Sequence, residues 1–248
     1  MSVRRPTGQP VRDLLATDVH LEHDGTACTV MGLRPEAPGM TIALLVDNSD
    51  WATNALPSLR DGLHRFLDAL PENHEVGLFT ISSQVRRRTG FTTDRDELKG
   101  EADRLFADPG GAVLLKGLFE TWNRRFETED AWPVFVLVVH DSLEPSHISE
   151  RRYNAFLSEP RARAATVHAV LLQIDRIGQR VYTDPLNRPR LSSTAGLRRE
   201  VVDLTSRTSG TFRSLTVATA LPQELSDLAA ELGTDHERAR DRYHVIYE

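Results

Sequence analysis

The sequence predicts an α/β protein: a doubly wound, mostly parallel central sheet with helices on both faces, preceded by a short N-terminal β ribbon. Two short and almost entirely apolar runs, Thr41–Val46 and Val134–Val139, are typical of central strands buried on both faces. Such strands alternate with amphipathic segments of roughly twelve residues, as crossover helices do between parallel strands. The chain of 248 residues is 40% hydrophobic and 27% charged, which is ordinary for a globular protein.

The N-terminal ribbon is predicted over Asp18–Leu33, where two extended stretches flank Asp24 and Gly25. This dipeptide tolerates the positive φ angles of a tight hairpin turn. The segment Arg34–Gly39 contains two prolines and is expected to link the ribbon to the first central strand.

The N-terminal half of the domain follows the alternation of strand and helix. Leucine and phenylalanine recur at helical spacing after Leu56, and Asp94 with Glu97 three residues later is typical of a capped helix start. Arginine-rich Val85–Gly90 suits a sheet edge better than a sheet centre. The expected elements are a strand over Thr41–Val46, a helix over Leu56–Leu70, strands over Glu75–Ser82 and Val85–Gly90, and a helix from Asp94 to Phe106.

The C-terminal half repeats the pattern, with one interruption. The segment Asp175–Leu197 is much longer than an ordinary connection, and such segments are functional or disordered. We assign residues 1–39 to an N-terminal tail and ribbon, and residues 40–248 to the α/β domain. The expected elements are a helix over Leu114–Phe126, a strand over Val134–Val139, a helix over Ile148–Leu157, a strand over Val167–Gln173, a helix over Arg199–Thr208, a strand over Gly210–Ser214, a helix over Leu221–Leu232 and a closing strand over Tyr243–Tyr247.

Composition excludes several classes of protein. The 30 basic and 36 acidic side chains leave a formal net charge of −6, which argues against generic nucleic-acid binding. No apolar run approaches the roughly 18 residues of a membrane-spanning helix. Cys28 is the only cysteine, so neither an internal disulfide nor a thiolate metal cluster can form.

Several local signatures, in order along most of the chain, resemble the von Willebrand factor type A (VWA) domain, in its bacterial VWA-related branch. ALLVDNSDW (Ala43–Trp51) is similar to that family's strand followed by Asp-x-Ser-x-Ser, and PGGAVLLKGL (Pro109–Leu118) to its Gly-Gly-Thr loop and helix. LVVHDS (Leu137–Ser142) is similar to its strand ending in Thr-Asp-Gly. The N-terminal ribbon and the segment from Thr208 to the C-terminus resemble the elements that flank the core in this branch.

The resemblance implies a metal-ion-dependent adhesion site, in which Mg²⁺ is held by oxygen ligands and binds an acidic residue of a partner protein. Asp47, Ser49 and Asp141 match three of its five ligands. The third hydroxyl of Asp-x-Ser-x-Ser falls on Trp51, and the threonine of Gly-Gly-Thr falls on Ala112. We therefore expect a degenerate site that binds Mg²⁺ or Mn²⁺ weakly or not at all, and no other cofactor.

Two other interpretations of these residues stay open. Asp47 and Asp141 could simply end their strands and accept hydrogen bonds from helix N-terminal amides. His140, Asp141 and a serine, Ser49 or Ser142, could form a hydrolase site, although neither serine lies in a Gly-x-Ser-x-Gly elbow and the sequence indicates no oxyanion hole.

Three further features are expected to be structural. His20 and His23 point to opposite faces of a strand and are interpreted as solvent-facing. Gly110 and Gly111 precede a helix but lack the lysine and hydroxyl of a phosphate-binding loop. The cluster Arg86–Arg88 is typical of a solvated edge strand.

The function predicted from the sequence is a non-enzymatic protein-interaction module. The long segment Asp175–Leu197 follows the carboxyl end of a predicted parallel strand and carries Arg188 and Arg190. We hypothesise that these arginines supply the positive charge that an acidic partner would otherwise find in the cation. The alternatives are a working Mg²⁺ adhesion site and the hydrolase.

Overall fold

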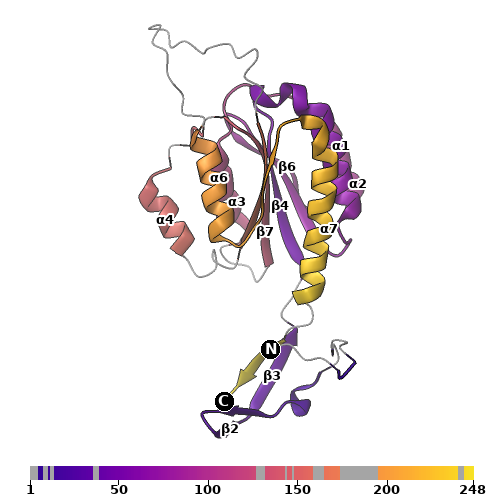
Figure 1. Ribbon diagram of the computed structural model, residues 1–248, viewed down its shortest axis with the longest axis vertical. Helices are drawn as coiled ribbons and strands as arrows, with labels where there is room; N and C mark the ends of the chain where they lie inside the picture. Colours follow the sequence, from indigo (N-terminus) through magenta and orange to yellow (C-terminus); the bar gives the residue numbers. More distant parts are fainter. Residues whose placement is uncertain are drawn as a thin grey trace.

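The computed structural model describes residues 5–7, 11, 14–35, 39–126, 132–142, 144–146, 148–158, 165–173, 195–239 and 243–248. Its main feature is a six-stranded sheet with the strand order β6-β5-β4-β7-β8-β9 (Figure 1). All neighbouring pairs are parallel except β5 and β6, so the predicted mostly parallel sheet is confirmed. The strands are β4 (Met40–Asp47), β5 (Glu75–Ile81), β6 (Val85–Thr92), β7 (Trp132–His140), β8 (Thr166–Leu172) and β9 (Phe212–Leu215).

Helices cover both faces of the sheet, as predicted for a doubly wound fold. Helices α1, α2 and α7 lie on one face, and α3, α4 and α6 lie on the other (Figure 1). Alternate residues of β4 enter the two cores: Ile42 and Leu44 pack under α1 and α7, and Ala43 and Leu45 pack under α3. The helices are α1 (Leu56–Ala69), α2 (Arg95–Asp103), α3 (Leu114–Thr121), α4 (Glu150–Ser158), α6 (Ala195–Arg207) and α7 (Leu221–Ala239).

The helix ends show where local sequence fixes structure and where packing overrides it. The Asp94 side chain accepts hydrogen bonds from the backbone N–H groups of Asp96 at 3.0 Å and Glu97 at 2.9 Å, which confirms the predicted cap. Helix α7, by contrast, continues past the predicted end at Leu232. A Cβ at Gly233 would lie 3.2 Å from Pro71, so this glycine permits close packing instead of ending the helix.

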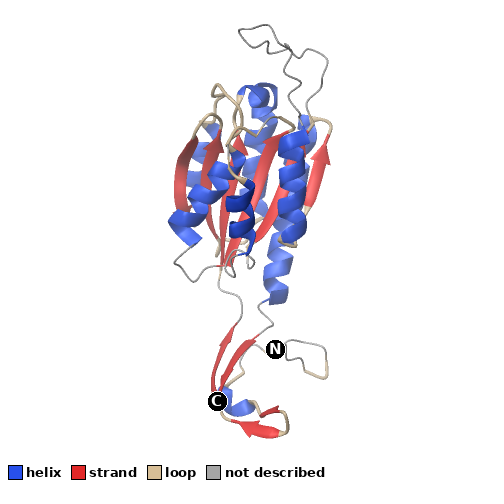
Figure 2. Ribbon diagram, turned by 90° about the vertical axis from the view of Figure 1, so that its left-hand side faces the viewer, coloured by secondary structure: helices blue, strands red, loops and turns tan. Residues whose placement is uncertain are grey.

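The ribbon is a separate pair of two-stranded sheets. β1 (Leu21–His23) and β2 (Thr26–Cys28) form the predicted hairpin, with φ of 52° at Asp24 and 77° at Gly25. β3 (Val30–Pro35) pairs antiparallel with β10 (Tyr243–Tyr247), so the C-terminal strand lies beside the N-terminal ribbon, outside the main sheet (Figure 2).

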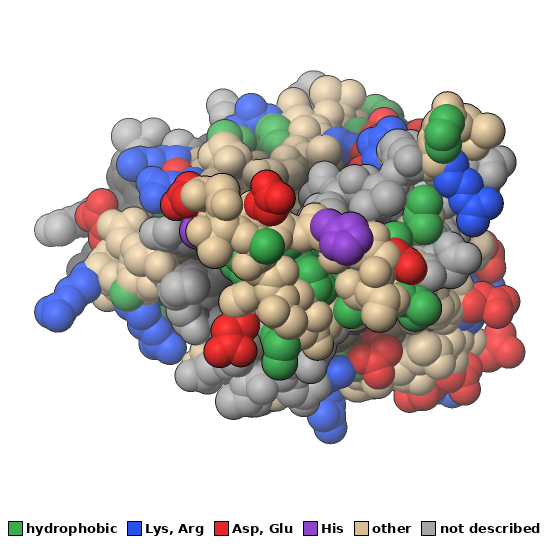
Figure 3. Space-filling model, turned by 90° about the horizontal axis from the view of Figure 1, so that it is seen from below, with side chains coloured by type: hydrophobic (Ala, Val, Ile, Leu, Met, Phe, Trp, Pro, Cys, Tyr) green, Lys and Arg blue, Asp and Glu red, His purple; other side chains and the backbone are tan. Residues whose placement is uncertain are grey.

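The ribbon end of the molecule carries exposed apolar side chains. Leu15, Met31 and Tyr247 are exposed, and the view onto this end shows apolar side chains among acidic ones (Figure 3).

None of the described helices is long and apolar enough to cross a membrane.

Candidate functional site

The carboxyl ends of β4 and β7 bring together the residues that the sequence singled out. The two strands pair in parallel, with Val46 opposite Val138. Asp47 ends β4 and Ser49 follows it, and at the same edge His140 ends β7 and Asp141 follows it. The chain leaves β4 for β5 on one side and places β7 on the other, which makes this edge the topological switch point where open α/β sheets collect ligands.

Asp47 is fully buried, and both of its oxygens accept hydrogen bonds from the chain itself. Oδ1 accepts from the backbone N–H of Ser49 at 2.8 Å, and Oδ2 accepts from the backbone N–H of His140 at 3.2 Å. The same Oδ2 lies 3.0 Å from Nδ1 of the buried His140 ring. A carboxylate can only accept, so Nδ1 donates and fixes the imidazole tautomer.

Ser49 and Asp141 differ from Asp47 because each keeps a side-chain oxygen without a partner. Ser49 Oγ and Asp141 Oδ1 are buried and have no hydrogen-bond partner among the described residues. The other Asp141 oxygen, Oδ2, lies 3.6 Å from Nε of Arg198 on α6. Ser142 Oγ and His140 Nε2 are likewise buried without a partner in the described part of the chain. Such atoms are uncommon in protein interiors.

The two positions where the family pattern has hydroxyls offer no oxygen side chain. Trp51 is partly exposed, and Ala112 is completely buried. Asp50, beside the loop, accepts a long hydrogen bond of 3.4 Å from the backbone N–H of Gly110. Within the described ranges, no group of three or more His, Cys, Asp or Glu side chains is arranged to hold a metal ion.

Glu144 is a residue at this edge that the sequence interpretation missed. Its Oε1 accepts a hydrogen bond from the backbone N–H of Leu115 at 3.0 Å, and Oε2 accepts from the backbone N–H of Ser146 at 3.0 Å. Ser146 Oγ in turn accepts from the backbone N–H of Lys116 at 3.0 Å. The start of α3, which follows Gly111, is therefore capped by the chain's own carboxylate, where an anionic ligand would otherwise bind.

The interpretation that Asp47 and Asp141 accept hydrogen bonds from helix N-terminal amides is therefore wrong for the described structure. Asp47 accepts from its own loop and from His140, and Asp141 faces Arg198, so neither caps a helix within the described structure. In the sequence, the available signal for Glu144 is its place three residues after Asp141, close to the end of the predicted strand.

The remaining candidates lie away from this edge. His20 and His23 are exposed on the ribbon, as predicted. Arg188 and Arg190 lie outside the described residues, so their proposed role stays a prediction.

The fold and this edge define an open α/β domain of the kind that binds ligands at the carboxyl ends of its strands. Residues 42–143 match the family model of the von Willebrand factor type A (VWA) domain. Domains of this family are commonly protein-interaction modules. A comparison with curated protein sequences finds no match.

Solved structures share the fold at low sequence identity. A von Willebrand factor type A protein from Catenulispora acidiphila is 14% identical with a TM-score of 0.59; the match covers 79% of this chain but only 43% of that protein. The conserved hypothetical protein BatB from Bacteroides thetaiotaomicron is 14% identical with a TM-score of 0.53, covering 79% and 100%. Proximal thread matrix protein 1 from the mussel byssus, with a zinc-occupied MIDAS motif, is 16% identical with a TM-score of 0.56, covering 81% and 48%.

Proposed function

We propose that this chain is a non-enzymatic, adhesion-type protein-interaction module whose metal site is degenerate. The observation that carries the proposal is the buried pair of Asp47 and His140. The residue that the family pattern would use as a metal ligand has an imidazole as its partner instead.

The chemistry of the remaining donors supports degeneracy. A cation at Asp47 would have to compete with three hydrogen bonds to its carboxylate, and each displaced donor would be left buried without a partner. Hard divalent cations need about six oxygen ligands, and the positions of Trp51 and Ala112 supply none. These residues therefore do not fit a tightly held Mg²⁺.

A working Mg²⁺ adhesion site built on Asp47, Ser49 and Asp141 is the second candidate. The observation in its favour is that Ser49 Oγ and Asp141 Oδ1 are buried without partners among the described residues, as ligand atoms would be without their ion. In that case the cation would bind a carboxylate of the partner.

A hydrolase is the third candidate, and the geometry supports it least. A serine nucleophile needs a hydrogen bond to its base. His140 Nε2, Ser49 Oγ and Ser142 Oγ each have no hydrogen-bond partner in the described structure, so no serine engages the imidazole. Generic ester and phosphate substrates, assayed beside a His140→Ala control, should show no activity that depends on His140.

Calorimetric titration of Mg²⁺ and Mn²⁺ into metal-stripped protein tests the proposal. We expect no saturable heat up to millimolar metal, both in the unaltered chain and in Asp47→Asn. Saturable binding that Asp47→Asn abolishes would overturn the degenerate site in favour of the second candidate.

A gain-of-function series sharpens this test. The double variant Trp51→Ser, Ala112→Thr restores both hydroxyls. We still expect little Mg²⁺ binding, because the His140 imidazole remains hydrogen-bonded to the Asp47 carboxylate. Adding His140→Thr should produce saturable heat. Equal binding in the double and triple variants would show that the imidazole does not block the carboxylate.

A further inference from the structure

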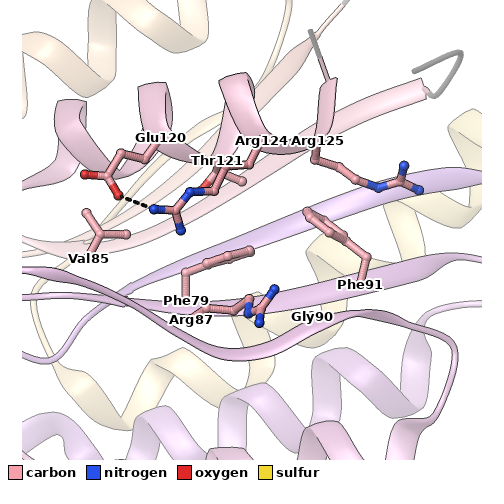
Figure 4. Close-up of a pocket in the computed structure, with 9 residues that line it drawn as sticks. All are labelled: Phe79, Val85, Arg87, Gly90, Phe91, Glu120, Thr121, Arg124 and Arg125. Atoms are coloured by element: carbon pink, nitrogen blue, oxygen red, sulfur yellow. Dashed lines mark hydrogen bonds and ion pairs between the residues drawn. The ribbon is translucent and has the colours of Figure 1, made fainter. Parts of the chain in front are cut away.

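A pocket of about 140 Å³ opens at the lateral edge of the sheet, away from the residues of the metal pattern. It lies between β5 and β6 on one side and the end of α3 on the other, where α3 passes into the π-helical turn η3 (Trp122–Phe126) (Figure 4). Phenylalanine rings and arginine side chains from these elements line it together.

Phe79 and Phe91 form an apolar floor, with ring centroids 5.7 Å apart. Gly77 makes room for both rings, because a Cβ there would lie 2.9 Å from Phe79 and 3.1 Å from Phe91. The floor therefore depends on the absence of a side chain at this position of β5.

A β-bulge shapes the wall on β6. Leu78 pairs with Thr89 and Val76 pairs with Thr92, so Gly90 and Phe91 together oppose Gly77. A Cβ at Gly90 would meet nothing within 4 Å, and its φ is not positive, so neither packing nor backbone conformation requires a glycine here. Bulges and isolated strand glycines mark places where a ligand or another backbone approaches.

Among the described residues, Arg87 is the arginine of the edge strand that has no ion-pair partner. Arg86 forms an ion pair with Asp108 at 3.3 Å, and Arg88 forms one with Glu101 at 3.0 Å. The exposed Arg87 guanidinium lines the pocket and has no ion-pair partner among the described residues. The expectation of a uniformly solvated arginine cluster therefore holds only in part.

Two more arginines border the pocket from η3. Arg124 lies 3.4 Å from Glu120, and Arg125 lies 2.8 Å from Glu75 with its guanidinium 5.6 Å from the centre of the Phe91 ring. Three guanidinium groups line the pocket, on a chain whose net charge is −6. Arg124 pairs with Glu120 and Arg125 with Glu75, whereas no carboxylate of the described residues pairs with Arg87. Among these named side chains the balance of charge is positive, opposite in sign to that of the whole molecule.

We propose that this pocket binds an acidic peptide segment of a partner protein, which inserts one apolar side chain over Phe79 and Phe91 and pairs its carboxylates with Arg87 and Arg124. A cavity of about 150 Å³ holds a benzene ring, so the pocket has room for one phenyl or branched aliphatic group. Guanidinium groups recognise carboxylates in a bidentate manner. This inference rests on the proposed interaction function and moves its partner-binding site from the carboxyl edge to the β6 edge.

Fluorescence anisotropy with the full chain tests the inference. The probe is a labelled short peptide of aspartates and glutamates with one central phenylalanine. We expect saturable binding that Arg87→Glu weakens about tenfold or more, as loss of a charge-assisted hydrogen bond would. Gly90→Val adds a branched side chain to the pocket lining at a position where a Cβ meets nothing within 4 Å, so it should weaken binding similarly while leaving the melting temperature unchanged.

Matched controls test whether binding depends on the position of the arginine, on the apolar side chain of the peptide and on its acidic residues. Arg199→Glu makes the same charge change at an exposed residue of α6 and should not alter binding. A peptide with serine in place of its phenylalanine, and one with lysines in place of its acidic residues, should each bind at least about tenfold more weakly.

Several outcomes would overturn the inference. The first is no binding to the unaltered chain, and the second is binding in Arg87→Glu and Gly90→Val as tight as in the unaltered chain. The others are loss of binding in an Arg188→Ser, Arg190→Ser variant instead, and concentration-dependent self-association that Arg87→Glu abolishes. The last would identify a second copy of the chain as the occupant. None of them depends on the metal titration, so failure of this inference and failure of the degenerate site are distinguishable.

Discussion

At the carboxyl edge of the sheet, Asp47 is completely buried and both of its oxygens accept hydrogen bonds from the chain. On β6, Arg87 is exposed, lines an apolar pocket and has no ion-pair partner among the described residues. The first charged side chain is satisfied internally and supports the fold. The second is the charge that we propose pairs with a partner protein.

The contrast teaches that a family motif locates a site without deciding whether the site is still used. The strand ends keep Asp47 and Asp141 at the switch point, but His140 and Arg198 have become their neighbours. The β6 edge carries no family motif, yet it combines positive charge with an apolar floor, which is the chemistry of recognition.

The largest expected effect is at the buried edge. Asp47→Ala leaves the imidazole and two backbone N–H groups buried without their acceptor, so it should lower the free energy of unfolding by about 3–5 kcal/mol. Urea denaturation measures this. The control is Asp103→Ala, which removes the partner of His64 in a pair of similar length, 2.9 Å, but exposed, and should cost less than about 1 kcal/mol. Equal losses would contradict the structural role of Asp47.

Lowering the pH should reduce the stability of the fold through two buried histidines, His74 and His168. His140 donates from Nδ1, whereas Nδ1 of His74 accepts from the backbone N–H of Met40 at 3.1 Å, so protonation would break that bond. Burial, aided by the nearby charges of His236 and Arg95, lowers the pKa of His74 from 6.5 to about 4, and burial lowers the pKa of His168 to about 4. Between pH 6.5 and about pH 4 these histidines bind more protons in the unfolded chain than in the folded one. Their contribution to the free energy of unfolding is therefore complete above pH 6.5 and is lost as the pH falls toward 4.

The loss should amount to about 3 kcal/mol for each of the two histidines across this window. Denaturation midpoints measured from pH 7 to pH 4 test it, with His74→Gln as the comparison because glutamine can accept without titrating. The slope of stability against pH should decrease by up to about 1.4 kcal/mol per pH unit in this variant. An unchanged slope would show that His74 does not contribute.

A smaller difference is expected between Gly77, which lies against the two rings of the pocket floor, and Gly90, which lines the pocket. Gly77→Ala would place a methyl group against the rings of Phe79 and Phe91 and should destabilise the fold by about 1–3 kcal/mol. Gly90→Ala meets open space and should be neutral or stabilise by up to about 1 kcal/mol, because alanine suits a strand interior better. Thermal melts of both variants give the comparison; destabilisation by Gly90→Ala would mean that this glycine serves the fold.

Local pattern predicted the elements well, and long-range pairing accounts for what it missed. The apolar run Thr41–Val46 predicted a strand buried on both faces. The structure confirms this, because each face of the strand packs under a different layer of helices. The partner of Tyr243–Tyr247 could not be predicted, since a short strand carries no mark of the strand, about 200 residues away, with which it pairs.

The candidate site shows the same division between local and distant information. The motif placed Asp47 and Asp141 at one edge, but the contact of Asp47 with His140 depends on the register of β4 against β7, which the sequence does not specify. Within the described structure, Arg87 lacks an ion-pair partner because the nearby carboxylates pair with its neighbours: Asp108, after α2, pairs with Arg86, and Glu101, on α2, pairs with Arg88. Neither could be predicted from spacing alone.

The smallest expected effect completes the comparison between the two regions. Arg87→Glu removes a side chain that contributes no ion pair within the described structure, so the free energy of unfolding should change by less than about 0.5 kcal/mol. Arg88→Glu, one residue along, places a carboxylate beside Glu101 and should destabilise by more, because both partners are largely shielded from water. If Arg87→Glu proved as damaging as Arg88→Glu, Arg87 would belong to the fold, and the β6 edge would resemble the carboxyl edge in using its charges internally.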